Sequence, residues 1–443
     1  MRYEKYKQTG TKWITSIPVS WNMQKIGALF VQRKEKVSDK DFAPISVTKN
    51  GILPQLATAA KTDDGDNRKK VCVGDFVINS RSDRKGSCGV SDLKGSVSLI
   101  NIVLQPRDQL SGRYAHYLLR NHLFSEEYYR NGRGIVADLW TTRYSEMKTI
   151  LLPVPPRAEQ DQIVRYLDWQ VSKINRLIAA KRKQIALLKE HRTAKINQAV
   201  TTGIHCDTQL AYTGYNWLPY APANWNPVPA KALFRNITEL RRLDDSMLAA
   251  TQKYGLIEQT EYMRLEGRRI VLANDNLDKW LHTEPNDFII SLRSFQGGLE
   301  MCSKPGCVTW HYVVLRSQRN IYPDFYKWFF KSAAYIGALQ KTSDFIRDGQ
   351  DLRFSNFVKV GLFIIPMDEQ REIAEYLNRE ISKYDVAISN LEKQIDQITE
   401  LRTRLISDVV TGQIDVRGIE VPEFEYVGEA DVAEEQDEES EVG

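Results

Sequence analysis

The sequence predicts an α+β fold with two similar mixed α/β domains and two long helices that form an antiparallel coiled coil, arranged as a pseudo-two-fold internal repeat. Three observations predict this fold. The chain of 443 residues is long enough for about three domains. Motifs near its start recur about 210 residues later. Each copy ends in a long stretch with coiled-coil periodicity.

The internal repeat is defined by four pairs of matching segments. Residues 13–30 match 217–234 and residues 49–52 match 253–256, both at a spacing of 204; residues 74–82 match 286–294 at 212, and residues 159–167 match 369–377 at 210. Small drifts in spacing indicate loop insertions. One unit of about 210 residues has therefore been duplicated.

The repeat and the charge pattern together predict five segments. They are a mixed α/β domain over 1–152, a helical spacer over 153–205, a second mixed domain over 206–365, a second helical spacer over 366–419 and an acidic tail over 420–443. The tail holds eleven acidic residues and no Lys or Arg, so residues 1–419 carry a net charge of +15. Like-charge blocks of this kind are usually disordered, and a basic body suits a polyanionic partner.

The two mixed domains contain more predicted strand than helix. Short β-rich runs at 70–78 and 97–104 are bounded by Gly, Asp and Pro, which is typical of strands. A helix is expected over 113–120, and 324–331 is its counterpart in the second domain.

The two long helices are predicted from apolar residues that alternate steps of four and three, as in a coiled coil. Pro residues precede both stretches, acidic residues fill their first turns, and Gly203 and Gly412 follow them. The first stretch, 157–201, has ten basic against four acidic residues, whereas 367–411 has six against ten. Opposite charge favours pairing of the two helices, and the alternative is that each folds back on its own domain.

Signals for catalysis, metal binding and membrane insertion are missing. No phosphate-binding loop, dinucleotide fingerprint or H-E-x-x-H occurs, and the nearest match to an adenine methyltransferase motif, 226–229, fails. Cys302 with Cys307, and His205 with Cys206, lack the second ligand pair of a metal site. The longest apolar runs are too short to span a bilayer, and five scattered cysteines indicate a reducing, cytoplasmic setting. We therefore expect a protein that is not an enzyme and holds no metal or cofactor.

Basic, glycine-containing loops follow equivalent predicted strands and precede both long helices. Arg and Lys can bind guanine edges or phosphates, Gln can read adenine, and Gly lets the backbone approach the groove. Solvated polar turns are the alternative for any single residue. The candidate DNA-binding residues are Lys49, Arg81, Ser82, Arg84, Lys85, Arg133, Arg143, Lys253, Tyr254, Arg293, Ser294, Gln296, Arg347 and Arg353.

The whole arrangement resembles the specificity subunits of type I restriction–modification systems. The resemblance covers nearly all of 12–417 and is carried by the opening motif 17–21, the Pro-rich helix entries with Glu159-Gln160 and Glu369-Gln370, and the helix ends at 199–203 and 409–415. It implies that the two mixed domains are target recognition domains and that the helices are spacers. The acidic tail departs from the family pattern, which offers no role for it.

The resemblance also implies the partners. The chain would recognise an asymmetric two-part site in double-stranded DNA and bind two modification (methyltransferase) subunits, and in some systems restriction (translocase and nuclease) subunits, as part of defence against foreign DNA. S-adenosylmethionine, ATP and Mg would bind to those partner subunits. Two alternatives stay open: a coiled-coil scaffold that organises partner proteins without reading DNA, and a combined nuclease and methyltransferase, which the missing methyltransferase motif disfavours.

Overall fold

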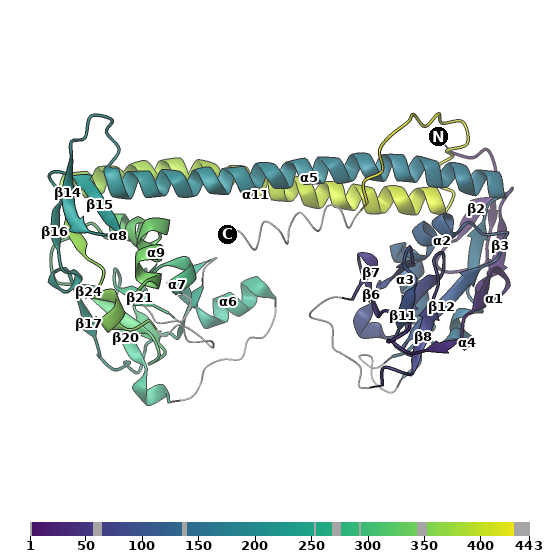
Figure 1. Ribbon diagram of the computed structural model, residues 1–443, viewed down its shortest axis with the longest axis horizontal. Coiled ribbons are helices and arrows are strands. Elements are labelled where there is room, and N and C mark those ends of the chain that lie inside the picture. The colour runs from purple at the N-terminus through teal and green to yellow at the C-terminus, as the bar shows by residue number, and fades with distance from the viewer. Residues whose placement is uncertain are drawn as a thin grey trace. The chain divides into compact units, whose positions relative to one another are not determined.

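The computed structural model describes residues 2–55, 64–134, 140–251, 254–267, 276–291, 294–342 and 352–428. The chain divides into two compact units, unit 1 (residues 1–183 and 391–443) and unit 2 (residues 184–390). Each unit holds a mixed α/β body and one half of each of the two long helices, α5 (Arg157–Thr202) and α11 (Met367–Val410) (Figure 1). The predicted fold class is therefore confirmed.

Unit 1 is built around a four-stranded antiparallel sheet with the strand order β10-β9-β12-β4. The unit also contains a three-stranded sheet (β11-β8-β5), two hairpins (β1-β2 and β6-β7) and the strand pair β13-β3. Its strands are β1 (Tyr6–Gln8), β2 (Ser16–Pro18), β3 (Asn22–Lys25), β4 (Phe30–Gln32), β5 (Lys36–Val37), β6 (Ile45–Thr48), β7 (Gly51–Pro54), β8 (Arg68–Val71), β9 (Phe76–Asn79), β10 (Cys88–Val90), β11 (Gly95–Val97), β12 (Asn101–Pro106) and β13 (Leu151–Val154). Its short helices are α1 (Ile26–Leu29), η1 (Ser82–Arg84), α2 (Gly112–Leu119), α3 (His122–Arg130) and α4 (Tyr144–Met147).

Unit 2 repeats this topology. Its central sheet has the order β22-β21-β24-β17, which matches β10-β9-β12-β4 strand for strand. Its strands are β14 (Leu210–Tyr215), β15 (Leu218–Pro222), β16 (Asn226–Val228), β17 (Phe234–Ile237), β18 (Leu248–Thr251), β19 (Gly255–Glu258), β20 (Leu281–Thr283), β21 (Phe288–Ile290), β22 (Glu300–Met301), β23 (Gly306–Val308), β24 (Val313–Ser317) and β25 (Leu362–Ile364). Its short helices are η3 (Ala230–Ala232), α6 (Gln259–Glu266), η4 (Leu277–Lys279), α7 (Ser294–Gly297), α8 (Pro323–Phe330), α9 (Ala333–Gln340) and α10 (Phe354–Phe357). The matching order confirms the internal repeat, and α2 and α8 confirm the predicted helices at 113–120 and 324–331.

The long helices pair in antiparallel fashion within each unit (Figure 1). In unit 1, Lys181 Nζ donates to Gln394 Oε1 at 2.6 Å, and Arg402 donates to Asn175 Oδ1 at 2.7 Å. In unit 2, Arg192 pairs with Asp385 at 2.9 Å and Lys195 with Glu380 at 3.5 Å. Residue numbers rise along one helix as they fall along the other. The ion pairs of unit 2 join the basic helix to the acidic one, as the charge pattern predicted.

Each long helix also packs on the body of its own unit. In unit 1, Leu167 of α5 and Val409 of α11 share a core with Phe76 of the central sheet and Tyr114 of α2. In unit 2, Ile196 of α5 and Leu377 of α11 share a core with Phe288 of the central sheet. The two geometries that the sequence presented as alternatives therefore coexist, because one apolar face of each helix is wide enough to contact both a partner helix and the body.

A Glu-Gln pair anchors the start of each long helix, and in unit 1 both of its side chains are buried. Glu159 Oε1 accepts hydrogen bonds from the Trp21 indole at 2.8 Å and from the Tyr3 hydroxyl at 2.6 Å. Gln160, which is fully buried, accepts a bond from the backbone N–H of Ser111 at 2.8 Å and donates to the Pro155 carbonyl at 3.0 Å.

The same anchor is present in unit 2. Glu369 accepts from the Trp225 indole at 2.9 Å, and Gln370 accepts from the backbone N–H of Tyr322 at 2.8 Å. The recurring Glu-Gln and Trp of the sequence motif are therefore structural: they fix the direction in which each helix leaves its domain.

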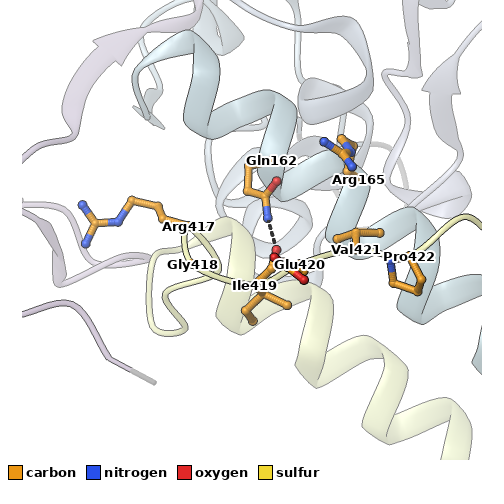
Figure 2. Close-up of a pocket in the computed structure, with 8 residues that line it drawn as sticks. All are labelled: Gln162, Arg165, Arg417, Gly418, Ile419, Glu420, Val421 and Pro422. Carbon is orange, nitrogen blue, oxygen red and sulfur yellow. Dashed lines mark hydrogen bonds between the residues drawn. The ribbon is translucent and has the colours of Figure 1, made fainter.

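The C-terminal segment corrects the expectation of a disordered tail from residue 420. Residues 416–428, here called the C-terminal strap, lie extended against α5 within unit 1. The Gln162 amide donates to the Ile419 carbonyl at 2.7 Å, and the two residues line an open hollow with Arg165 and Arg417 (Figure 2). Further along, the Asn175 amide donates to the Val427 carbonyl at 2.9 Å. Residues 429–443 lie outside the described residues.

The strap buries polar groups of α5 that would otherwise face water. Asn175 is 0% exposed, and Ser172 accepts a hydrogen bond from the Val427 backbone N–H. Arg176 binds the Glu425 carboxylate at 2.9 Å, and Arg113 lies over the Tyr426 ring at 5.0 Å.

Removal of the strap is expected to destabilise unit 1. A chain that ends at residue 415 should lose about 2–3 kcal/mol of unfolding free energy relative to a chain that ends at 428, because several hydrogen bonds to buried groups are lost at once. Chemical denaturation of the two truncated chains measures the difference, and the comparison isolates residues 416–428. Equal midpoints would mean that the strap contributes nothing to stability.

A buried histidine in unit 2 lies between two carboxylates. His282 is 1% exposed; its Nδ1 lies 2.9 Å from Asp245 Oδ2, and its Nε2 lies 2.9 Å from Glu284 Oε1. Both ring nitrogens can donate only in the imidazolium form. Burial lowers the pKa of His282, but the bonds to Glu284 and Asp245 outweigh it, in spite of the nearby charge of Arg242, and the net shift of the pKa is upward.

This upward shift predicts a pH dependence for unit 2. A raised folded-state pKa contributes stability that is complete below the unfolded value of 6.5 and is lost as the pH rises through the folded value. We expect the thermal midpoint of unit 2 to fall as the pH rises above about 6.5, and His282→Gln to flatten this slope. His191→Gln on exposed helix surface is the control, and a slope that survives in His282→Gln would contradict the assignment.

Candidate nucleic-acid interface

The candidate interface of unit 1 begins where the central strand β9 ends. Residues 80–87 form a loop from β9 to β10 that is closed at its base by a hydrogen bond from the Asn79 backbone N–H to the Ser87 carbonyl at 3.0 Å. Asn79, Ser80 and Ser87 are buried there. The buried base holds the backbone firmly, while Arg81 and Arg84 are exposed.

A second loop lies directly against the first. The Thr142 backbone N–H donates to the Ser80 carbonyl at 2.9 Å, and the Ser82 N–H donates to the Trp140 carbonyl at 3.0 Å. On its other side, Thr141 exchanges two backbone hydrogen bonds with Arg133, at 3.1 and 3.2 Å. The loop after β9 and the segment between α3 and α4, which are distant in sequence, therefore form one surface at residues 80–82, 133 and 140–142.

This surface carries three exposed arginines, Arg81, Arg133 and Arg143. Within the described part of the chain, none of the three has an ion-pair partner. Arg84 is also exposed, at 69%, and is 4.0 Å from Asp83. Free guanidinium groups on a firmly held backbone are suited to phosphate or guanine contacts.

Two other predicted residues of unit 1 stand apart from this cluster. Lys85 forms an ion pair with Glu126 of α3, and the hydrogen bond from Lys85 lowers the pKa of that carboxylate. Its charge is therefore already partly neutralised. Lys49 is exposed in the turn between β6 and β7, where its carbonyl accepts a hydrogen bond from Arg120 at 2.7 Å. Their roles in DNA binding stay predictions.

Unit 2 places one arginine at the position equivalent to Arg143. Arg353 is exposed and is the residue immediately before α10, as Arg143 is immediately before α4, and both short helices lead into the strand before a long helix. Gln296 is also exposed, on α7. Lys253, Arg293 and Arg347 lie outside the described residues.

Two predicted residues of unit 2 have structural partners instead. Ser294 is 1% exposed, and its hydroxyl accepts a hydrogen bond from the Ser291 backbone N–H at 2.8 Å, so this side chain has no surface to offer a base. The hydroxyl of Tyr254 donates to Glu266 of α6 at 3.2 Å, which ties the β18-β19 turn to that helix.

A bidentate ion pair stabilises the sheet behind each interface. Arg33 binds both carboxylate oxygens of Asp75 at 2.7 and 3.1 Å, and Arg316 binds those of Asp287 at 2.8 and 2.7 Å. Asp75 and Asp287 occupy equivalent positions of the repeat, and both are 1% exposed. The sequence matched these aspartates but did not indicate their partners: Arg33 directly follows β4, whereas Arg316 lies on β24.

Sequence reasoning also missed the apolar side chains of the interface. Trp140, Leu99 and Ile100 are 38%, 42% and 38% exposed beside the loop after β9. Apolar residues in a sequence usually indicate core, so no local signal could have placed them on the surface.

Among the described residues, no group of three or more His, Cys, Asp or Glu side chains is placed to hold a metal ion. Within the same residues, no helix is long and apolar enough to cross a membrane.

No protein-family model matches the chain, and no curated protein matches it in sequence. Solved structures do match. A chain from a structural study of complex assembly and conformational transition in the type I restriction–modification system aligns with a TM-score of 0.60 and 14% identity, over 90% of this chain and 99% of that one. The chain has the fold of a type I restriction–modification protein.

Two further type I proteins align at lower scores. The HsdS subunit from Thermoanaerobacter tengcongensis aligns at a TM-score of 0.48 with 15% identity, over 92% of this chain and 100% of that one. The type I restriction–modification S subunit from M. genitalium aligns at 0.35 with 14% identity, over 96% and 100%. The fold seen in the alignment at 0.60 agrees with the resemblance in the sequence motifs.

Proposed function

We propose that this chain is the DNA-specificity subunit of a type I restriction–modification complex. It reads an asymmetric two-part DNA site, one half with each unit, and positions two methyltransferase subunits on that site. The chain itself is not catalytic. S-adenosylmethionine would bind to the methyltransferase subunits, which flip an adenine out of each half-site before modifying it, and ATP and Mg would bind to restriction subunits where these are present.

One observation carries this proposal. Two units of the same topology present exposed arginines at equivalent loop positions, Arg143 in unit 1 and Arg353 in unit 2, on bodies whose loop sequences differ. Because the two units place these arginines at equivalent positions, both are suited to bind the same kind of polyanion. Because their loop sequences differ, the two units are suited to recognise different half-sites. The net charge of +15 on residues 1–419 supports the same partner.

The test is single-molecule methylation sequencing of the host genome with and without the gene for this chain. We expect a split motif with N6-methyladenine in both halves to disappear on deletion. If no motif changes, DNA binding of the purified complex with its methyltransferase partner is measured against salt concentration. Binding that is weak and insensitive to salt at every concentration would reject the proposal in favour of a scaffold protein.

A further inference from the structure

We propose that Trp140 in unit 1 and Trp310 in unit 2 contact DNA bases directly, each by stacking on or inserting between the bases of its own half-site. This inference rests on the proposed function and adds to it one aromatic residue in each unit that contacts DNA. All nine tryptophans of the chain lie in described segments, and these two alone are exposed, at 38% and 43%. Each unit has one.

Trp140 is held by backbone hydrogen bonds at its own carbonyl and at the residue that follows it. Its own carbonyl accepts the Ser82 N–H, and the next residue, Thr141, is paired with Arg133 through two backbone hydrogen bonds. A large apolar side chain whose backbone is fixed but whose ring faces solvent loses little conformational freedom when it binds a ligand. The ring is therefore preorganised for a contact.

The surroundings of Trp140 favour DNA as the ligand. Leu99 and Ile100, in the turn between β11 and β12, are also exposed. Their turn adjoins the loop that Trp140 contacts, since the Ile100 carbonyl accepts the Ser80 N–H at 3.3 Å. Arg81 and Arg133 flank the same loops without ion-pair partners in the described part of the chain. An exposed apolar patch marks a binding site, and unpaired arginines around it favour a polyanion over a protein surface.

Trp310 lies at the equivalent end of the sheet in unit 2, at the position of Leu99 and Ile100 rather than that of Trp140. It lies in the turn between β23 and β24, which is the counterpart of the turn at 98–100. Because Ile290, the last residue of β21, pairs with Val313 at the start of β24, this turn lies at the end of the sheet where the loop after β21 begins. The Trp310 ring lies against the ring of His311, tilted by 31° with centroids 3.6 Å apart, and Trp310 remains 43% exposed.

An aromatic ring adds what the arginines lack. Guanidinium groups at the loop rim bind phosphates and base edges, but they do not recognise how easily two bases separate. A tryptophan that inserts between two bases, or stacks on an exposed base, must separate neighbouring base pairs. This costs less free energy where the two base pairs unstack easily, so the contact favours flexible base-pair steps. It would also help to separate the bases around an adenine that is to be flipped.

The test uses the full chain in complex with its methyltransferase partner and duplexes that carry the mapped two-part site. Trp140→Ala should weaken binding about 10- to 100-fold through one half-site, and Trp310→Ala should do the same through the other. Trp140→Phe, which keeps an aromatic ring, should recover most of the loss. Tyr212→Ala is the matched control, since Tyr212 is a 70% exposed aromatic residue on the β14-β15 hairpin, away from the loops.

A direct readout comes from 2-aminopurine placed at successive positions of the half-site. Wild-type protein should raise its fluorescence at one step, and Trp140→Ala should abolish that increase while the thermal midpoint of the protein stays unchanged. Unchanged binding by both alanine variants would overturn the inference, as would loss of methyltransferase binding in the absence of DNA. If the wild-type complex distinguishes no half-site at all, it is the proposed function that fails.

Discussion

Glu159→Ala is expected to lower the unfolding free energy of unit 1 by about 3 kcal/mol, because two buried donors lose a charged acceptor at once. Trp21 is 0% exposed and Tyr3 is 6% exposed, so neither the indole N–H nor the hydroxyl can turn to water instead. Burial and the bond to Glu159 raise the pKa of Tyr3, so the phenol stays protonated and remains a donor at neutral pH. Hydrogen exchange of amides in unit 1, together with thermal unfolding, measures the loss.

Two variants test the reason for this effect. Glu159→Gln keeps an oxygen acceptor of the same size and should cost about 1 kcal/mol. Glu369→Ala, at the equivalent position, should cost about 1–2 kcal/mol in unit 2, because Glu369 is only half-buried and its second donor, Asn224, is exposed. If Glu159→Gln were as unstable as Glu159→Ala, the charge rather than the hydrogen bonds would be responsible.

Replacement of both Arg81 and Arg143 by Ala is expected to reduce affinity through one half-site by about 100-fold, since each good arginine–base contact is worth about 1–3 kcal/mol. Both arginines are exposed and belong to loops joined by the backbone bonds around Thr142. The measurement is the affinity for four duplexes: the complete site, each half-site altered alone, and both altered.

The four duplexes separate base contacts from phosphate contacts. For the double variant, alteration of the first half-site should cause no further loss of affinity. Alteration of the second half-site should reduce affinity by the same factor as for wild-type protein. Arg353→Ala should show the reverse pattern, with a smaller loss because one arginine is removed instead of two. Equal losses on all four duplexes, with a shallower salt dependence, would show that these arginines hold phosphates and read no base.

The long helices and the repeat could be predicted because their signals are local and periodic. The four-then-three spacing of apolar residues, with Pro before and Gly after, predicted α5 and α11 to within one residue at most ends. The Glu-Gln and Trp motifs recurred at regular spacing, although their function as a helix anchor required the structure. The strap was missed because a rule about charge blocks judges residues 420–428 by composition, whereas the backbone carbonyls of Glu425 and Val427 accept hydrogen bonds from α5.

The interface could be predicted only in part. A basic loop after a predicted strand made Arg81 a candidate and a basic loop before a long helix made Arg143 one, but nothing in the sequence showed that residues 80–82 and 140–142 lie together. Ser294 belonged to the same pattern and is buried, since its hydroxyl caps the backbone rather than facing solvent. Lys85 belonged to the same pattern, but it forms an ion pair with Glu126.

By itself, the sequence determined the duplication, the two helices, their opposite charges and the basic character of the body, because each of these follows from residue type and spacing along one chain. The tertiary structure alone decided which arginines have no ion-pair partner among the described residues, which serine is buried and which two tryptophans face solvent. These properties depend on partners that approach from other parts of the chain, such as Thr141 beside Arg81 or Glu126 beside Lys85. Exposure and pairing arise from long-range contacts, and no local pattern encodes them.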